Sequence, residues 1–197
     1  MESLLAFSSV CVYCGSSGLV AQKFKQAAQS VGTELARRGV QLVYGGGHVG
    51  LMGIVADSAL KAGGKVVGII PEHIRAQEVQ HNGLTALHVV SDMHTRKRMM
   101  VEQSDAFIIL PGGLGTLDEA FEILTWKKLK LHSKPIILFN QDGYWDEMIA
   151  LIDKTIDEGF SQPADRVLFK EVDTLEALFA ALDEPGVPDR GALTGRM

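Results

Sequence analysis

Short apolar runs alternate along the chain with longer segments in which apolar residues recur at helical spacing. The runs at 107–110 and 135–139 are continuously apolar, as expected for parallel strands that helices cover on both faces. This pattern predicts strands at 7–14, 40–44, 65–70, 86–90, 105–110, 135–139 and 166–170. It predicts helices at 20–38, 50–62, 92–103, 115–131, 144–158 and 173–183.

The repeated alternation of strands and helices predicts a doubly wound, Rossmann-like α/β fold, with a mostly parallel sheet and helices on both faces. We expect one nucleotide-binding domain at 1–183 and a flexible tail at 184–197, which is rich in proline and glycine. The polar stretch 71–85 is long for a connection between strands, so it is a candidate binding loop or lid. Because such sheets bind ligands beyond the carboxyl ends of their strands, the loops there are the place to look for function.

Composition narrows the function classes. The chain has 197 residues, of which 46% are hydrophobic and 22% charged, so global disorder is excluded. Its formal net charge of −5 argues against a nucleic-acid binder. No apolar run approaches the about 18 residues that a membrane helix needs, and the first residues lack the basic segment of a secretory signal. We therefore expect a cytoplasmic protein that binds neither nucleic acid nor membranes.

Cys11 and Cys14 form a Cys-x-x-Cys pair within a predicted strand. Their side chains should point to opposite faces of the sheet about 10 Å apart, too far for a disulfide. With no second pair the motif does not predict a zinc site, and the six histidines show no metal-ligand spacing. We expect two ordinary buried thiols and no bound metal.

Two glycine-rich loops follow predicted strands. They contain Gly45, Gly46, Gly47 and Gly50 in the first, and Gly112, Gly113, Gly115 and Thr116 in the second. Glycine lets the backbone approach a ligand closely, and the following helix start supplies free N–H groups for a phosphate. The alternative is that these glycines only make tight turns from strand to helix. Two such loops in one sheet favour a nucleotide or a sugar phosphate as the ligand.

The first of these loops also matches the dinucleotide fingerprint Gly-x-Gly-x-x-Gly, and Glu72 follows Gly50 by 22 residues. It follows the second predicted strand rather than the first, which weakens the match. A nicotinamide-dependent oxidoreductase nevertheless remains one alternative. A P-loop is excluded, because Leu51 stands where its lysine should be.

The predicted helix 92–103 carries three cationic side chains. A helical projection places Met93, Lys97, Met100 and Val101 on one side. Arg96 lies at the edge of this stripe, whereas Arg98 points nearly opposite, beside Glu102, and is expected in solvent. Arg96 and Lys97 are therefore the better candidates for binding a phosphate.

Glu119, which follows the second glycine-rich loop with Asp118 before it and Glu122 after it, has two interpretations. Thr116-x-x-Glu119 matches a capping box, in which the glutamate only accepts a hydrogen bond at the helix start. Alternatively, Glu119 is a catalytic carboxylate. A position near a helix start keeps a carboxylate ionised, which suits a base or a stabiliser of positive charge.

Together these motifs resemble the Lonely Guy (LOG) phosphoribohydrolases, long mislabelled lysine decarboxylases. The likeness rests on Gly45-Gly46-Gly47-x-x-Gly50-Leu-Met-Gly53, Met93-His94-x-Arg96-Lys97 and Pro111-Gly112-Gly113-x-Gly115-Thr116-x-x-Glu119, and it runs from about Val10 to beyond Pro135. The resemblance implies hydrolysis of N6-substituted adenosine 5′-monophosphates to the free base and ribose 5-phosphate, without a cofactor. Asp118 departs conservatively from the family, because many members have a second glutamate there.

The resemblance also implies residue roles and an assembly. Arg96 and Glu119 would be the catalytic pair. With the glycine-rich loops, the substrate contacts would be Glu78, Met93, Arg96, Lys97, Gly112, Gly113, Gly115, Thr116, Glu119, Thr125, Gly46 and Gly47. The family forms homodimers, some of which assemble further. The two apolar faces of the predicted helix 115–131 fit either a subunit interface or full burial.

The main alternative is a non-enzymatic carrier of a phosphorylated cofactor, such as the molybdenum cofactor. Such carriers share the Pro-Gly-Gly-x-Gly-Thr loop, so this loop does not decide between the two functions. The Met-His-x-Arg-Lys stretch together with Glu119 favours the enzyme. Amino-acid decarboxylation would need a lysine for a pyridoxal Schiff base, and nothing in the sequence singles one out.

Overall fold

A seven-stranded sheet forms the centre of the molecule. The structure, a computed structural model, describes residues 7–75 and 80–184. The strand order is β4-β3-β2-β1-β5-β6-β7, and every described pair is parallel, which confirms the doubly wound α/β prediction. The strands are β1 (Ser9–Tyr13), β2 (Gln41–Tyr44), β3 (Val66–Pro71), β4 (Ala86–Val90), β5 (Ala106–Ile109), β6 (Ile136–Phe139) and β7 (Lys170–Val172).

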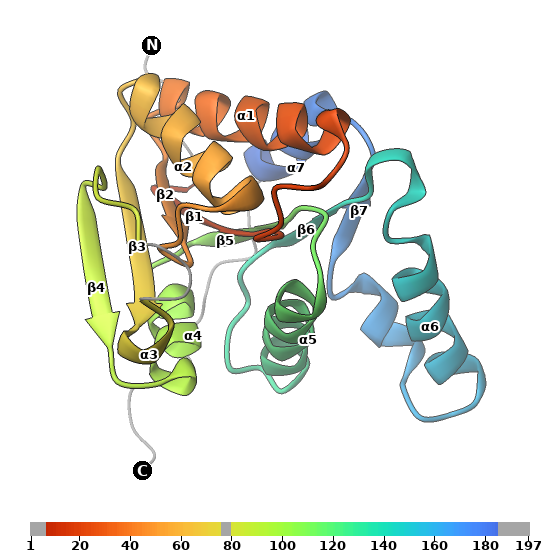
Figure 1. Cartoon of the computed structure of the whole chain (residues 1–197). Helices are drawn as coiled ribbons and strands as arrows, with labels where there is room; N and C mark the ends of the chain where they lie inside the picture. Colours follow the sequence, from red (N-terminus) through yellow and green to blue (C-terminus); the bar gives the residue numbers. More distant parts are fainter. Residues whose placement is uncertain (1–6, 76–79, 185–197) are drawn as a thin grey trace.

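Helices cover the sheet in two layers (Figure 1). One layer holds α1 (Gln22–Arg37), α2 (Gly50–Lys61) and α7 (Leu175–Asp183), and the other holds α4 (Met93–Glu102), α5 (Leu114–Lys128) and α6 (Asp146–Asp157). A short α3 (Glu72–Arg75) follows β3, and two 3-10 segments are η1 (Gln141–Gly143) and η2 (Pro163–Val167). Among the described residues, no helix is both long enough and apolar enough to span a membrane.

The core is divided by the sheet into two apolar clusters. Along β1, Val10 and Val12 pack toward α1 and α2, whereas Cys11 packs toward the α4 and α5 layer. Cys14 belongs to the first cluster, so the two thiols lie on opposite sides of the sheet. Both are free and buried, which confirms the prediction of ordinary buried thiols.

The strand order reverses at β1, which pairs with both β2 and β5. Ligands of doubly wound sheets bind at the carboxyl ends of the two strands that flank such a reversal. The loop after β1 is held between its neighbours: Gly15 N–H donates to Pro111 O at 3.1 Å, and Leu51 N–H donates to Gly15 O at 3.0 Å. Three loops, after β1, β2 and β5, therefore meet where the fold places a ligand.

The predicted strand at 166–170 is wrong in position. Residues 163–167 form η2, and β7 begins only at Lys170. Pro163 starts the 3-10 turn, and Asp165 Oδ2 accepts a hydrogen bond from Gln162 N–H at 3.0 Å. Proline at a helix start and this cap both favour a helical turn. The predicted tail lies outside the described residues from 185 onward, as does 76–79 of the candidate loop 71–85.

Candidate active site

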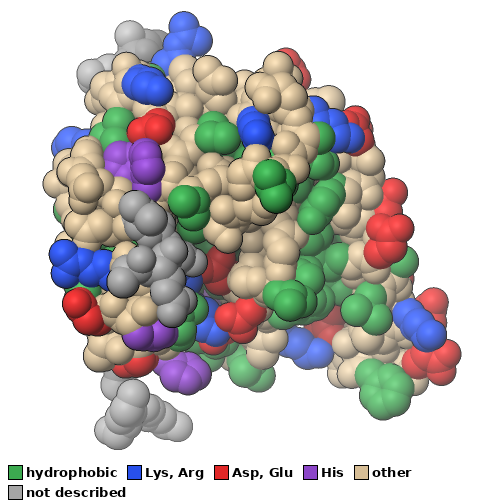
Figure 2. All heavy atoms as spheres, in the orientation of Figure 1, with side chains coloured by type: hydrophobic (Ala, Val, Ile, Leu, Met, Phe, Trp, Pro, Cys, Tyr) green, Lys and Arg blue, Asp and Glu red, His purple; other side chains and the backbone are tan. Residues whose placement is uncertain are grey.

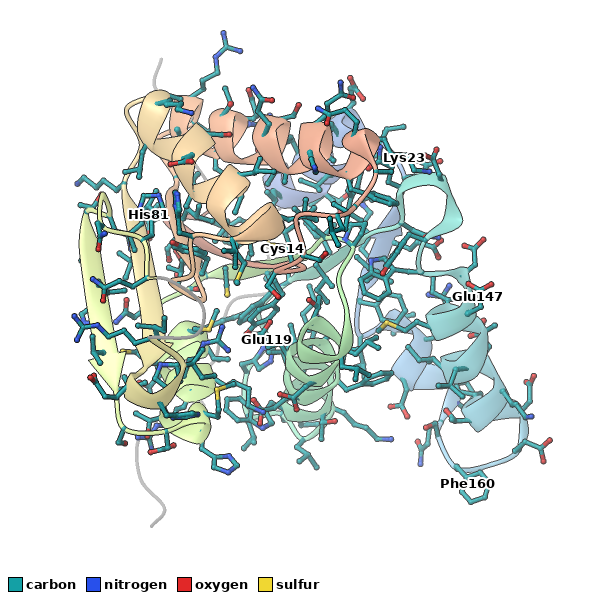
Figure 3. All side chains as sticks on the ribbon, viewed as in Figure 1. Cys14, Lys23, His81, Glu119, Glu147 and Phe160 are labelled. Atoms are coloured by element: carbon teal, nitrogen blue, oxygen red, sulfur yellow. The ribbon has the colours of Figure 1, made fainter. Side chains whose placement is uncertain are left out.

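A buried ion pair between α4 and α5 is the centre of the site. Arg96 Nη1 lies 2.7 Å from Glu119 Oε1, and each side chain is only 9% exposed. Arg96 Nε also donates to the carbonyl of Ile69 in β3 at 3.1 Å. In Figure 3, Glu119 extends from α5 toward the sheet edge near Cys14. The pair therefore lies beside the strand reversal, where the fold places a ligand.

Local sequence explains how these helices begin. Asp92 caps α4, with its Oδ1 accepting a hydrogen bond from Thr95 N–H at 2.8 Å. Helix α5 has Gly113 as its N-cap, so Thr116 is its third residue and not its cap. The capping-box interpretation of Glu119 is therefore wrong. The carboxylate lies beyond the first turn, and Arg96 rather than the helix start favours its ionised form.

The first glycine-rich loop packs against the guanidinium of Arg96. A Cβ on Gly45 would lie 2.2 Å from Arg96 Nη2, so a larger residue there would displace the guanidinium. Gly46 and Gly47 are buried, and their backbones contact the chain that precedes β4. Gly46 O accepts from His81 N–H at 3.1 Å, and Gly47 forms a β-bridge with Gln80. Close packing accounts for Gly45 and for Gly46, which also has a φ of +80°, and a substrate contact by Gly46 or Gly47 stays a prediction.

The second glycine-rich loop is open instead. Within the described chain, the backbone N–H groups of Gly113, Leu114 and Gly115 make no hydrogen bond. A Cβ on Gly113 or Gly115 would have no described atom within 4 Å, and neither residue has a positive φ. Neither packing nor backbone conformation therefore requires glycine at these two positions. Backbone amides without a partner on exposed residues are suited to an anionic ligand.

Gly112 differs from the other glycines of this loop, because the chain itself packs against it. A Cβ there would lie 2.1 Å from Thr116 Oγ1 and 2.9 Å from Gly15 N. Thr116 is buried, so its hydroxyl lies on the interior side of the loop and not on the solvent side. Gly112 and Thr116 shape the loop, and direct contact with a ligand by either one remains a prediction.

Lys97 joins the same two helices through a second set of ion pairs. Its Nζ lies 3.0 Å from Asp118 Oδ2 and 3.1 Å from Glu122 Oε1, with 9% of the lysine side chain exposed. Burial alone lowers the lysine pKa, but hydrogen bonds to both carboxylates raise it above the usual 10.5. Lys97 therefore stays charged and already has two anionic partners, with which a substrate phosphate would have to compete. Arg98 lies outside, 3.8 Å from Glu102, as predicted.

The remaining predicted site residues are more scattered. Met93 is half-buried at the start of α4, and Thr125 is exposed on α5. Six residues of helix rotate Thr125 about 240° around α5 from Glu119, so the two side chains face different directions. Glu78 lies outside the described residues. The fold of one chain thus brings together Arg96, Glu119 and the second glycine-rich loop, and it leaves Thr125 apart.

No spacing in the sequence indicated the cluster formed by His48, Asp57 and His81, whose ligand atoms lie within 4.8 Å of one another. His81 Nε2 lies 3.1 Å from Asp57 Oδ1, while Gly83 N–H donates to His81 Nδ1 at 3.0 Å. The acceptor role of Nδ1 places the proton of the neutral ring on Nε2, which donates it to Asp57. A metal on Nε2 would instead need a proton on Nδ1, facing Gly83 N–H. The hydrogen bond from His81 to Asp57 therefore fastens the chain before β4 to α2.

The fold and the site define a class of protein: a doubly wound α/β protein with open backbone amides for an anion beside a buried carboxylate paired with an arginine. The chain belongs to the family described as "Possible lysine decarboxylase", whose model matches residues 52–182. This confirms the family resemblance that the motifs indicated.

Named relatives share most of the chain. A cytokinin riboside 5′-monophosphate phosphoribohydrolase of Rhodococcoides fascians is 47% identical over 90% of this chain and 90% of its own length. A probable enzyme of the same name from Oryza sativa subsp. japonica is 44% identical over 94% of this chain and 76% of its own.

Solved structures show the same fold. The molybdenum cofactor carrier protein of Chlamydomonas reinhardtii has a TM-score of 0.69 at 20% identity, covering 90% of this chain and 96% of that one. A protein solved as a structural genomics target has a TM-score of 0.69 at 25% identity, covering 90% of this chain and 99% of that one. At 20% identity the likeness to the carrier concerns the fold alone.

Proposed function

We propose that the protein is a nucleoside 5′-monophosphate phosphoribohydrolase. It hydrolyses the N-glycosidic bond of N6-substituted adenosine 5′-monophosphates and releases the free base and ribose 5-phosphate. The names of relatives at 47% and 44% identity support this substrate class. The structural observation that carries the proposal is the buried Arg96–Glu119 pair next to the open amides of Gly113 and Gly115.

The pair and the loop suit the chemistry of this bond. Cleavage develops positive charge on the ribose ring, which a nearby carboxylate stabilises. Arg96 keeps Glu119 ionised and holds its direction, and the amides of the second glycine-rich loop bind the 5′-phosphate. Glu119 orients a water molecule and accepts its proton as the oxygen bonds to C1′. The electrons of the broken bond leave with the base, which takes up a proton.

A second copy of the chain fits the outer face of α5. Leu114 is 85% exposed and Phe121 is 38% exposed, and Leu117 and Thr125 follow the same side of the helix at spacings of three and four residues. Figure 2 shows hydrophobic side chains gathered over this part of the molecule. We infer a homodimer through this face, because a second copy would cover these side chains. Thr125 faces away from Glu119 of its own chain. In the homodimer it would contact the nucleotide bound by the other copy.

The alternatives have less support. A carrier of a phosphorylated cofactor needs the open amides but has no use for a buried, ionised carboxylate beside them. An oxidoreductase needs an open dinucleotide loop, whereas Gly46 and Gly47 are buried in this structure. The cytoplasmic location remains a prediction from the sequence.

A substrate panel tests the proposal. The protein is incubated with AMP, with an N6-alkylated AMP and with the matching nucleoside, and free base and ribose 5-phosphate are measured. We expect release from the monophosphates and little from the nucleoside, which lacks the phosphate that the loop binds. Binding of the nucleotides without any release would overturn the enzyme assignment in favour of a carrier.

A further inference from the structure

Tyr144, which follows η1 between β6 and α6, contacts the second glycine-rich loop from outside. Its hydroxyl donates a hydrogen bond to the carbonyl of Gly112 at 2.8 Å, across 32 residues of sequence. No motif of the sequence singled out this tyrosine. A residue from another loop of the sheet therefore holds the loop whose amides face the candidate ligand position.

The ring of Tyr144 is positioned independently of this hydrogen bond. It packs edge-on against Phe24 of α1 at 5.4 Å and against Trp145 at 4.8 Å between ring centroids. Trp145 is 3% exposed, and its backbone N–H donates to Asn140 Oδ1 at 2.6 Å. Removal of the hydroxyl alone would therefore leave the ring in place.

The hydrogen bond fixes the rotation of one peptide unit. In a trans peptide the carbonyl and the following N–H point in opposite directions within one plane, and the described chain has no cis peptide. Because Tyr144 turns the Gly112 carbonyl toward itself, the N–H of Gly113 points to the other side. That N–H has no partner in the described chain, and Gly113 is exposed.

The preceding peptide, Pro111–Gly112, is also held in place, by the loop after β1. Gly15 N–H donates to the carbonyl of Pro111 at 3.1 Å. Thr116 and Gly15 also leave no room for a side chain at Gly112. Two successive peptides of the loop are therefore each held by one hydrogen bond, the Pro111–Gly112 peptide by Gly15 and the Gly112–Gly113 peptide by Tyr144.

We propose that Tyr144 is a positioning residue for phosphate binding: its hydroxyl fixes the Gly112–Gly113 peptide so that Gly113 N–H faces the phosphate of the nucleotide. This inference deepens the proposed function and rests on it. Tyr144 itself does not touch the reacting atoms.

The test is Tyr144→Phe, which keeps the ring and removes the hydroxyl. Loss of one hydrogen bond predicts an about three- to tenfold weaker affinity for ribose 5-phosphate, measured by calorimetry without turnover. The KM for the nucleotide should rise by the same factor while kcat stays unchanged, because phosphate binding is equal in the ground state and the transition state.

Asp142→Asn is the matched control. Asp142 lies in the same loop and pairs with Lys23 at 2.8 Å, so this variant should bind ribose 5-phosphate as the unaltered protein does. Unchanged affinity in Tyr144→Phe, or an equal loss in Asp142→Asn, would overturn the proposal. An unaltered protein that binds ribose 5-phosphate but cleaves no nucleotide would refute the proposed function and leave the role of Tyr144 standing.

Discussion

Glu119 has its carboxylate 2.7 Å from Arg96 Nη1 and is 8% exposed as a residue. Glu119→Gln keeps the size of the side chain and an oxygen that accepts from Arg96, but it removes the charge. We expect kcat to fall about 100-fold or more, as when one charge-stabilising group of an active site is lost, with folding retained by circular dichroism. Glu122→Gln is the control, because Glu122 pairs with Lys97 instead. Equal turnover in the two variants would refute the role of Glu119.

A substitution of Gly45 is a second single-residue test, because this glycine acts by leaving space for the guanidinium of Arg96. In Gly45→Ala the new Cβ would lie 2.2 Å from Arg96 Nη2, so the guanidinium has to leave its position beside Glu119. We expect a drop in kcat together with an overpacking cost of about 1–3 kcal/mol in the free energy of unfolding. Steady-state kinetics and urea denaturation measure the two effects, and a normal kcat would show that the Arg96 position does not matter.

At the scale of elements, Asp105 joins β1 and β5 across the strand reversal. Its Oδ2 accepts from the backbone N–H of Ser8 and of Ser9, both at 2.9 Å, and from the hydroxyl of Ser8 at 2.7 Å. Burial raises the pKa of Asp105, but these hydrogen bonds outweigh it and hold the pKa below its usual 3.8. The ionised form therefore stabilises the fold near neutral pH.

Asp105→Asn should consequently lower the free energy of unfolding at pH 7 by about 1 kcal/mol, because the amide oxygen still accepts from Ser8 and Ser9 but without the charge that strengthens these hydrogen bonds. A carboxyl whose pKa is depressed by folding contributes stability above its unfolded pKa and loses it as the pH falls. The difference between the two proteins should thus shrink as the pH falls below about 4. Urea denaturation at several pH values measures it, and a difference that does not depend on pH would contradict this account.

The sequence alone predicts most helices and strands but not the contacts between them. Elements with continuous apolar runs, such as the predicted strands 105–110 and 135–139, lie close to the observed β5 and β6, since burial on both faces leaves such a run in the sequence. Residues 166–170 were misassigned because a proline turn competed with a short apolar run. The Arg96–Glu119 contact, the Tyr144 hydroxyl and the His81 cluster join segments far apart in sequence. No spacing rule could place them together before the strand order was known.

For the whole molecule, the exposed face of α5 predicts the assembly. Phe121→Asp places a charge in the middle of this apolar face, so it should convert the protein to a monomer in size-exclusion chromatography with light scattering. Phe160→Asp is the matched control, because Phe160 is 86% exposed beyond the end of α6, away from α5 (Figure 3). A Phe121→Asp protein of unchanged mass would refute an interface through α5.

Cys11 and Cys14 are buried on opposite sides of the sheet, and burial raises the pKa of both thiols. Because maleimides and alkylating reagents attack thiolates, the folded protein should behave toward them as if it had no cysteine. One cysteine introduced on the surface would then be the sole point of attachment for a fluorophore or a spin label, without prior removal of the natural pair.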